Sequence, residues 1–132
     1  MALKMSKRMF RFFGAGRELF ADALIFRGAA LLSFLFVLAT ATLAWWKIVP
    51  LAETAPFIPL HYNVYLGVDR FGSWRQAFTL PAIGLGLLLV NLGFEAVFFR
   101  SERMLAYFFA LATLVSEIVL FVSMILLVLL NL

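Results

Sequence analysis

Polar side chains that could take part in catalysis or binding lie in one short loop of this chain. This loop holds the single histidine, His61. Asn63, Asp69 and Arg70 follow within the same loop. His61 and Asn63 either bind a ligand, a peptide or a metal, or they hydrogen-bond within the loop and fix its shape. Because protein metal sites usually need several ligands, one histidine does not make such a site. We therefore favour the structural role, keep binding at an outer face as the alternative, and expect Asp69 and Arg70 to be turn and surface residues.

Glu117 is a second candidate, because it lies midway along the apolar run 104–130, where a charge is costly. Burial disfavours the charged form of a carboxylate, so a protonated Glu117 fits this place. Counting depth from the turn at 100–103 puts small and hydroxyl residues of other runs near its level: Gly84, Gly86, Thr40 and Thr42. The side chain either couples to protons or ions, or forms an interhelical hydrogen bond or a subunit contact. The lack of a basic mate favours the second role.

Asn91 and Glu95 lie four residues apart, on one face of the apolar run 77–99. Glu95 is close to the end of that run and is expected to form a salt bridge with Arg27, Arg100 or Arg103. A face of small residues on the same run predicts close helix packing, against the first helix, the third helix or another copy of the chain. Its members are Ala82, Gly86 and Gly93.

The composition places these residues in a membrane protein. The chain has 132 residues, of which 65% are hydrophobic, and its mean hydropathy is +1.05. Soluble domains are only about 45–50% apolar, and a single small globule cannot bury this much apolar surface. The absence of cysteine excludes disulfides and thiolate chemistry. No phosphate-binding loop, metal-ligand cluster or Ser/His/Asp set is visible, so we expect no cofactor, no metal and no enzyme activity.

The predicted fold is an all-α integral membrane protein with three transmembrane helices, forming one membrane domain over 1–132. A bilayer core requires about 20 apolar helical residues, and three runs satisfy this requirement: 28–49, 77–99 and 104–130. The second and third runs are joined only by RSER, at 100–103, which predicts an antiparallel helical hairpin.

The first residues predict an amphipathic helix over 4–26, lying flat on the membrane surface, with a solvated tail as the alternative. Six of the eleven basic residues lie between Lys4 and Arg27. Such asymmetry indicates topology rather than nucleic-acid binding. It predicts a multi-pass protein of the inner (plasma) membrane, with the N-terminus in the cytoplasm and the 50–76 loop and the C-terminus outside. Trp45, Trp46 and Trp74 fall at the predicted outer interface.

The 50–76 loop predicts a short ordered extracytoplasmic cap, with a re-entrant loop as the alternative. Its prolines favour an extended path over 50–59. Alternation over 60–66 predicts a half-buried strand, and the following GVDRFG, at 67–72, has turn chemistry. A small strand or hairpin is therefore expected in the cap. SWRQ has the pattern of a capping box, with Ser73 as the N-cap of the second membrane helix and Pro81 in its first turns.

This loop also resembles a bacterial membrane domain of unknown function. The residues that carry the resemblance are Ile58, Pro59, His61 and Asn63, followed by Gly67 and Asp69. The domain occurs in the family of the sporulation-delaying toxin immunity protein, where an IP.H.N..G..D motif follows a first membrane helix. Here three residues separate Asn63 from Gly67 and one separates Gly67 from Asp69, where the family has two and two. The resemblance covers 56–74 and implies a small multi-helix membrane protein with an immunity, sensing or regulatory role.

Two functional hypotheses follow from the sequence. The first is a non-enzymatic membrane protein that acts by binding, as a subunit of a membrane complex or as an immunity- or sensing-type protein. The alternative is a small oligomeric transporter or channel subunit that uses Glu117. In both, the expected partners are membrane lipids and either copies of the chain or other membrane subunits, without nucleic acid.

Overall fold

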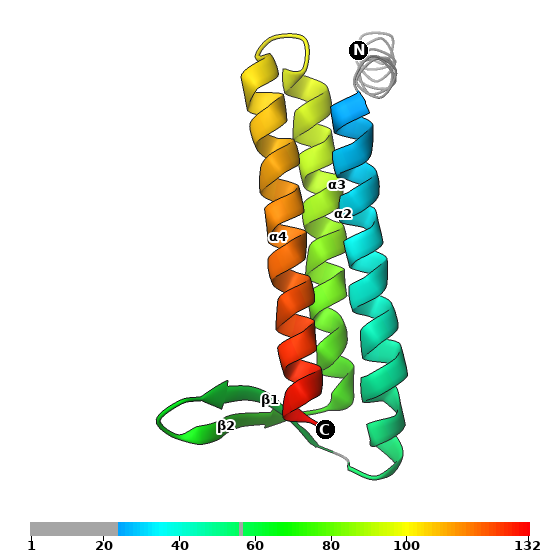
Figure 1. Ribbon diagram of the computed structural model, residues 1–132, viewed down its shortest axis with the longest axis vertical. Helices are drawn as coiled ribbons and strands as arrows, with labels where there is room; N and C mark the ends of the chain where they lie inside the picture. The colour runs from blue at the N-terminus through cyan, green and yellow to red at the C-terminus, as the bar shows by residue number, and fades with distance from the viewer. Residues whose placement is uncertain (1–23, 56) are drawn as a thin grey trace, which may run out of the picture. The chain divides into compact units, whose positions relative to one another are not determined.

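The computed structural model describes residues 24–55 and 57–132, which form three long helices and one strand pair (Figure 1). Helix α2 spans Leu24–Leu43, α3 spans Thr79–Phe98 and α4 spans Arg103–Leu130. Strands β1 (Ile58–Asn63) and β2 (Gly67–Gly72) lie between α2 and α3 in the chain. The amphipathic helix expected over 4–26 lies outside the described residues, apart from its last three.

Three helical segments are long and apolar enough to cross a membrane: Leu24–Glu53, Trp74–Phe98 and Arg103–Leu130, of 30, 25 and 28 residues. The three expected runs are therefore confirmed as helices of this kind, and the described chain is compatible with a multi-pass membrane protein. The first and second segments are longer than their apolar runs because shorter helical turns extend α2 and precede α3. A π-helical turn (Ala44–Ile48) and a 3-10 turn (Val49–Glu53) continue α2, and a 3-10 turn (Trp74–Phe78) precedes α3.

The extended path expected over 50–59 is wrong for its first residues, because Pro50 lies in the first turn of the 3-10 helix Val49–Glu53. A proline is tolerated there, since its missing N–H would have no partner inside the helix. Ser73 occupies the N-cap position as expected, with extended backbone angles, but its side chain makes no capping hydrogen bond. The main chain forms the turn instead, because the Gln76 N–H donates to the Ser73 carbonyl over 2.9 Å.

The chain divides into two compact units, and each long helix contributes one segment to each unit. The first unit contains described residues 24–34 and 86–115. Its buried cluster consists of Phe26, Phe99, Ala106 and Ala110. The Phe26 ring stacks on Tyr107 at 4.6 Å and meets the edge of Phe99 at 5.6 Å. The short connection between α3 and α4 closes this unit, as the sequence predicts.

The second unit contains described residues 35–55, 57–85 and 116–132, including the strand pair. Its buried cluster joins β1 to the helices through seven residues: Ala44, Ile48, Ile58, Ala77, Met124, Leu127 and Val128. Ile58 is the member that comes from β1, and it is almost fully buried. This apolar contact holds the base of the strand pair against the ends of the helices in this unit.

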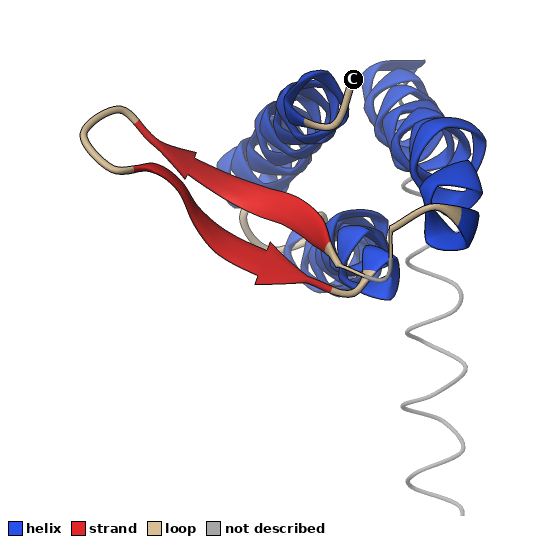
Figure 2. Ribbon diagram, turned by 90° about the horizontal axis from the view of Figure 1, so that it is seen from below, coloured by secondary structure: helices blue, strands red, loops and turns tan. Residues whose placement is uncertain are grey.

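The two strands form an antiparallel hairpin that runs out past the helix ends of its unit (Figure 2). Its register pairs Ile58 with Gly72 and Asn63 with Gly67, with irregularities around His61. A hairpin in the cap was expected, but the assignment of its parts was wrong. GVDRFG, expected as the turn, is strand β2, and the end of the expected strand, 64–66, is the turn.

Candidate functional site

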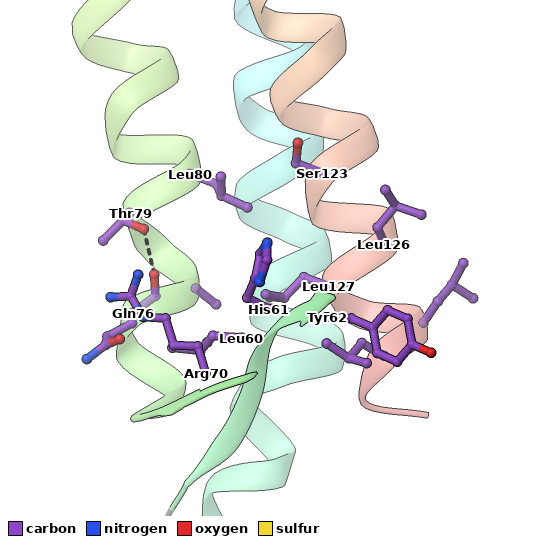
Figure 3. A pocket seen from close by; sticks show the side chains of 13 residues that line it. Leu60, His61, Tyr62, Arg70, Gln76, Thr79, Leu80, Ser123, Leu126 and Leu127 are labelled. Atoms are coloured by element: carbon purple, nitrogen blue, oxygen red, sulfur yellow. Dashed lines mark hydrogen bonds between the residues drawn. The ribbon is translucent and has the colours of Figure 1, made fainter. Parts of the chain in front are cut away.

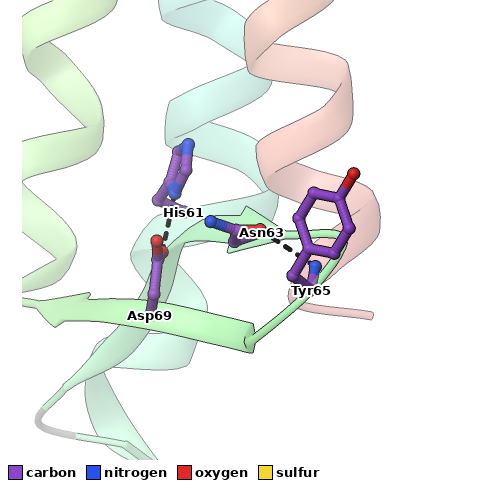
Figure 4. A network of polar contacts seen from close by, with 4 residues as sticks. All are labelled: His61, Asn63, Tyr65 and Asp69. Carbon is purple, nitrogen blue, oxygen red and sulfur yellow. Dashed lines mark hydrogen bonds and ion pairs between the residues drawn. The ribbon is translucent and has the colours of Figure 1, made fainter.

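The hairpin uses three of the four candidate residues of the loop, His61, Asn63 and Asp69, for its own structure (Figure 4). His61 on β1 and Asp69 on β2 face each other, with Nδ1 and Oδ1 2.6 Å apart. The His61 side chain remains 63% exposed. A carboxylate in this place orients the imidazole and leaves its Nε2 edge accessible to a further hydrogen bond.

Asn63 shapes the turn between the strands (Figure 4). Its Oδ1 accepts a hydrogen bond of 2.9 Å from the Tyr65 N–H, which is the geometry of an Asx turn. Gly67 ends the turn with a φ of 75°, a conformation that residues with a Cβ rarely adopt. The preference for a structural role of His61 and Asn63 agrees with this geometry, and binding by either residue stays a prediction.

Asn131 fastens the hairpin to α4, although nothing in the sequence near it signals this role. Its side-chain amide donates to the Pro59 carbonyl on β1 and to the Leu127 carbonyl on α4, over 2.8 Å each. The Pro59 contact spans 72 residues of sequence. Together with the burial of Ile58, this tie fixes where the hairpin lies within the second unit.

A pocket of about 800 Å³ opens between the hairpin, the beginning of α3 and the end of α4 (Figure 3). Its helix side is mostly apolar, with Leu80 from α3 and Leu126, Leu127 and Leu130 from α4, and it also includes the hydroxyl residues Thr79 and Ser123. The hairpin contributes His61 and Arg70. Arg70 was expected at a turn, but it lies in β2, paired in register with His61. The pocket joins residues that are far apart in sequence, so no local motif predicts it.

Glu117 is buried in the second unit, with only 1% of its surface exposed. Its Oε1 atom has no hydrogen-bond partner in the described part of the chain. Gly84 of α3 lies directly against the carboxyl group, because a Cβ added there would be 2.5 Å from Oε2. The prediction that Gly84 lies at the level of Glu117 is therefore confirmed. A role of Glu117 in proton or ion coupling stays a prediction.

Asn91 of α3 reaches across to α4 in the first unit, where its amide donates to Thr113 Oγ1 over 2.8 Å. Thr113 in turn donates to the Phe109 carbonyl over 2.7 Å. Glu95, one turn along the same face from Asn91, is buried at 3% exposure. The salt bridge expected between Glu95 and Arg27, Arg100 or Arg103 stays a prediction.

The small-residue face of α3 makes no close contact among the described residues. A Cβ added to Gly86 or Gly93 would meet no atom within 4 Å, and Ala82 is exposed. Packing against another copy or another protein stays a prediction for this face. Within the described ranges no group of three or more His, Asp or Glu side chains is placed to hold a metal ion.

The three apolar helices are compatible with a multi-pass membrane protein, and this protein carries a small β-hairpin with a pocket beside it. Comparison with known proteins finds no matching family model, no matching curated protein and no matching solved structure. The resemblance of 56–74 to the membrane domain of unknown function therefore stays a prediction.

Proposed function

We propose that the chain is a non-enzymatic protein of the inner (plasma) membrane that acts by binding another protein through its hairpin. It does so as a subunit of a membrane complex or as an immunity- or sensing-type protein. The observation that carries this proposal is the apolar turn of the hairpin. Val64, Tyr65 and Leu66 are 84%, 94% and 76% exposed. Exposed apolar patches of this kind mark interaction sites on proteins.

The way the hairpin is held supports the same proposal. An isolated two-stranded hairpin is marginally stable in water, so this one depends on its anchors. Ile58 is buried against the helices, and Asn131 is bonded to the Pro59 carbonyl. The His61–Asp69 pair and the Asn63 turn bond satisfy polar groups along the hairpin. A supported hairpin that ends in three exposed apolar residues is suited to present them to a partner.

The hairpin also offers its partner main-chain groups, because a two-stranded sheet has two open edges. Unpaired strand edges pair readily with an extended segment of another chain. In the proposed topology the hairpin lies outside the membrane and the N-terminus lies in the cytoplasm. The partner then approaches from the outer side, and the small-residue face of Ala82, Gly86 and Gly93 offers a second contact within the bilayer.

Site-specific photo-crosslinking in the native membrane tests this function. A photoreactive phenylalanine derivative replaces Tyr65 in the turn or, as the control, Leu89, which is 61% exposed on α3. We expect a discrete protein adduct from position 65 and lipid adducts alone from position 89. The same protein should appear as a stoichiometric subunit in native mass spectra of the gently extracted complex.

The proposal fails if position 65 yields only lipid adducts, because the turn would then lie in the membrane surface. It also fails if positions 65 and 89 capture the same set of proteins, since contact would then reflect crowding in the membrane rather than a site. An adduct between two copies of this chain would make the partner a homo-oligomer, which is within the proposal.

A further inference from the structure

The pocket between the hairpin and the helices is large enough for a ligand and is lined differently at its two ends. Its volume of about 800 Å³ lies within the usual range of small-molecule sites, about 300–1,000 Å³. Leu80 and Leu126 line the part along the helices, whereas Arg70 and Gln76 line the part at the hairpin (Figure 3). An occupant that matches this lining has a hydrocarbon portion and a polar end.

The positive charge of Arg70 at the hairpin end of the pocket favours an occupant whose polar end is anionic. Arg70 takes part in no ion pair within 4.0 Å among the residues that the structure describes. The neighbouring carboxylate, Asp69, is paired with His61 and does not line this pocket, although it shares an adjacent hollow with Arg70. A guanidinium group binds phosphate through paired hydrogen bonds, and Arg70 supplies one at this end of the pocket. Gln76 adds amide donors nearby.

The position of the pocket favours a lipid, and not a water-soluble anion, as its occupant. All of its leucines except Leu60 belong to the segments Trp74–Phe98 and Arg103–Leu130, both apolar enough to cross a membrane, whereas Leu60 and Arg70 lie on the hairpin outside them. Trp45 and Trp74 pack on Phe78 at the same end of the second unit, at 6.5 and 6.2 Å between ring centroids. Tryptophan rings gather where bilayer and water meet. The pocket therefore extends from the hydrocarbon level to the headgroup level.

From this lining, charge and position we propose that the pocket binds an anionic phospholipid. The phosphate contacts the Arg70 guanidinium under the hairpin, and an acyl chain lies along Leu80 and Leu126. The bound lipid fills the space between the hairpin and the helices and thereby supports the hairpin from below. This inference is independent of the partner proposed for the turn, because the pocket is lined by residues of the strands and helices and by none of the three turn residues.

Native mass spectrometry from lipid nanodiscs tests the inference. The purified full chain is placed in discs that contain equal amounts of phosphatidylglycerol and phosphatidylcholine, and the lipid retained on the protein is identified. We expect one phosphatidylglycerol to be retained in preference to phosphatidylcholine. Arg70→Gln should lower this preference about tenfold, which corresponds to the loss of a hydrogen bond to a charged group.

The matched control is Arg75→Gln, which removes the same charge from a residue that stacks on Trp74, at 5.4 Å, and does not line the pocket. A second variant, Leu126→Trp, enlarges a side chain of the apolar part without changing the charge and should likewise lower the retention of phosphatidylglycerol. Leu126 is 60% exposed, so the larger ring can be accommodated, and Leu89→Trp is its control outside the pocket.

Three results would overturn the inference. One is equal retention of the two lipids by the unchanged chain. Another is an equal loss of preference in Arg70→Gln and Arg75→Gln, which would indicate a general effect of charge. The third is evidence that no phospholipid occupies this pocket, namely either unchanged retention in Leu126→Trp or retention of a free fatty acid with no phospholipid. None of these outcomes bears on crosslinking at Tyr65, so the two proposals fail separately.

Discussion

Among single residues, the contact between Gly84 and Glu117 has the clearest physical consequence. A Cβ at position 84 would lie 2.5 Å from Glu117 Oε2 and 3.2 Å from both Cδ and Oε1. No real side chain tolerates the first of these distances, so the carboxyl group or the helix would have to move. A residue with a Cβ at position 84 would therefore displace the buried carboxyl group of Glu117 or the helix that carries it.

We expect Gly84→Ala to destabilise the protein by about 1–3 kcal/mol, the usual cost of overpacking a well-packed interior. The free energy of unfolding, measured by titration with a denaturing detergent in mixed micelles, checks this value. Gly86→Ala is the control, because its Cβ would meet no described atom within 4 Å. That change should be neutral or stabilising by up to about 1 kcal/mol, since alanine favours helix over glycine.

Combining Gly84→Ala with Glu117→Ala identifies the cause. If the carboxyl group is what the new methyl group meets, the double variant should lose less stability than the sum of the two single changes. Additive losses, or equal effects of Gly84→Ala and Gly86→Ala, would contradict the contact.

The sequence could place Glu117 in depth but could not choose its neighbour. Depth counting put Gly84 and Gly86 opposite it together, because both lie within one helical turn. Two residues along a helix are rotated by about 200°, so only one of them can face a given neighbour. Which one does so depends on the rotation of the whole helix, and this is set by packing distributed along its length.

Among the elements, the hairpin shows where local patterns mislead. Leu60, Tyr62, Val64 and Leu66 alternate with polar residues, which is typical of a strand, yet the strand ends at Asn63. The Asn63 side chain satisfies the Tyr65 N–H, and Gly67 supplies the positive φ, so three apolar residues form the turn. The polar and glycine-rich GVDRFG pairs as a strand because its partner, β1, supplies the other half of the ladder.

The hydrogen bond from Asn131 to the hairpin can be tested by substitution. Asn131→Ala removes the hydrogen bond to the Pro59 carbonyl, and a typical bond contributes about 1 kcal/mol. Amide hydrogen exchange over 58–63 should therefore become about fivefold faster, while exchange in α3 stays unchanged. Leu132→Ala, at a neighbouring residue that is 84% exposed, serves as the control. Uniform acceleration through the whole chain would mean that Asn131 supports the fold in general instead of the hairpin.

For the whole molecule, the three apolar helices were predictable because the thickness of a bilayer fixes both the length and the polarity of a spanning segment. The buried polar contacts were not predictable in this way. Asn91 was singled out, but its partner Thr113 gives no signal in the sequence, since threonine is common in apolar helices and its role appears only when α3 and α4 pair. The same holds for Asn131, whose partner is 72 residues away.

The proposed topology can be tested with introduced cysteines, because the chain has none of its own. Val64→Cys in the hairpin turn should react with a membrane-impermeant thiol reagent added to intact cells. Ser101→Cys, between α3 and α4, should react only after the membrane is permeabilised, since a helix of 25 residues separates it from the hairpin. Reaction of both positions from the same side would contradict the three-span topology, and reaction of Ser101→Cys alone would reverse its orientation.

The bond between Asn131 and the Pro59 carbonyl also bears on the order in which the protein matures. The hairpin is synthesised before α3 and α4, but its anchors, Met124, Leu127 and Asn131, belong to the last helix and the residue that follows it. A chain halted after α3 would leave Ile58 and the Pro59 carbonyl without these partners. Closure of the cap therefore has to wait until α4 has been synthesised and packed, and a hairpin held in this place marks a chain in which α4 has already folded.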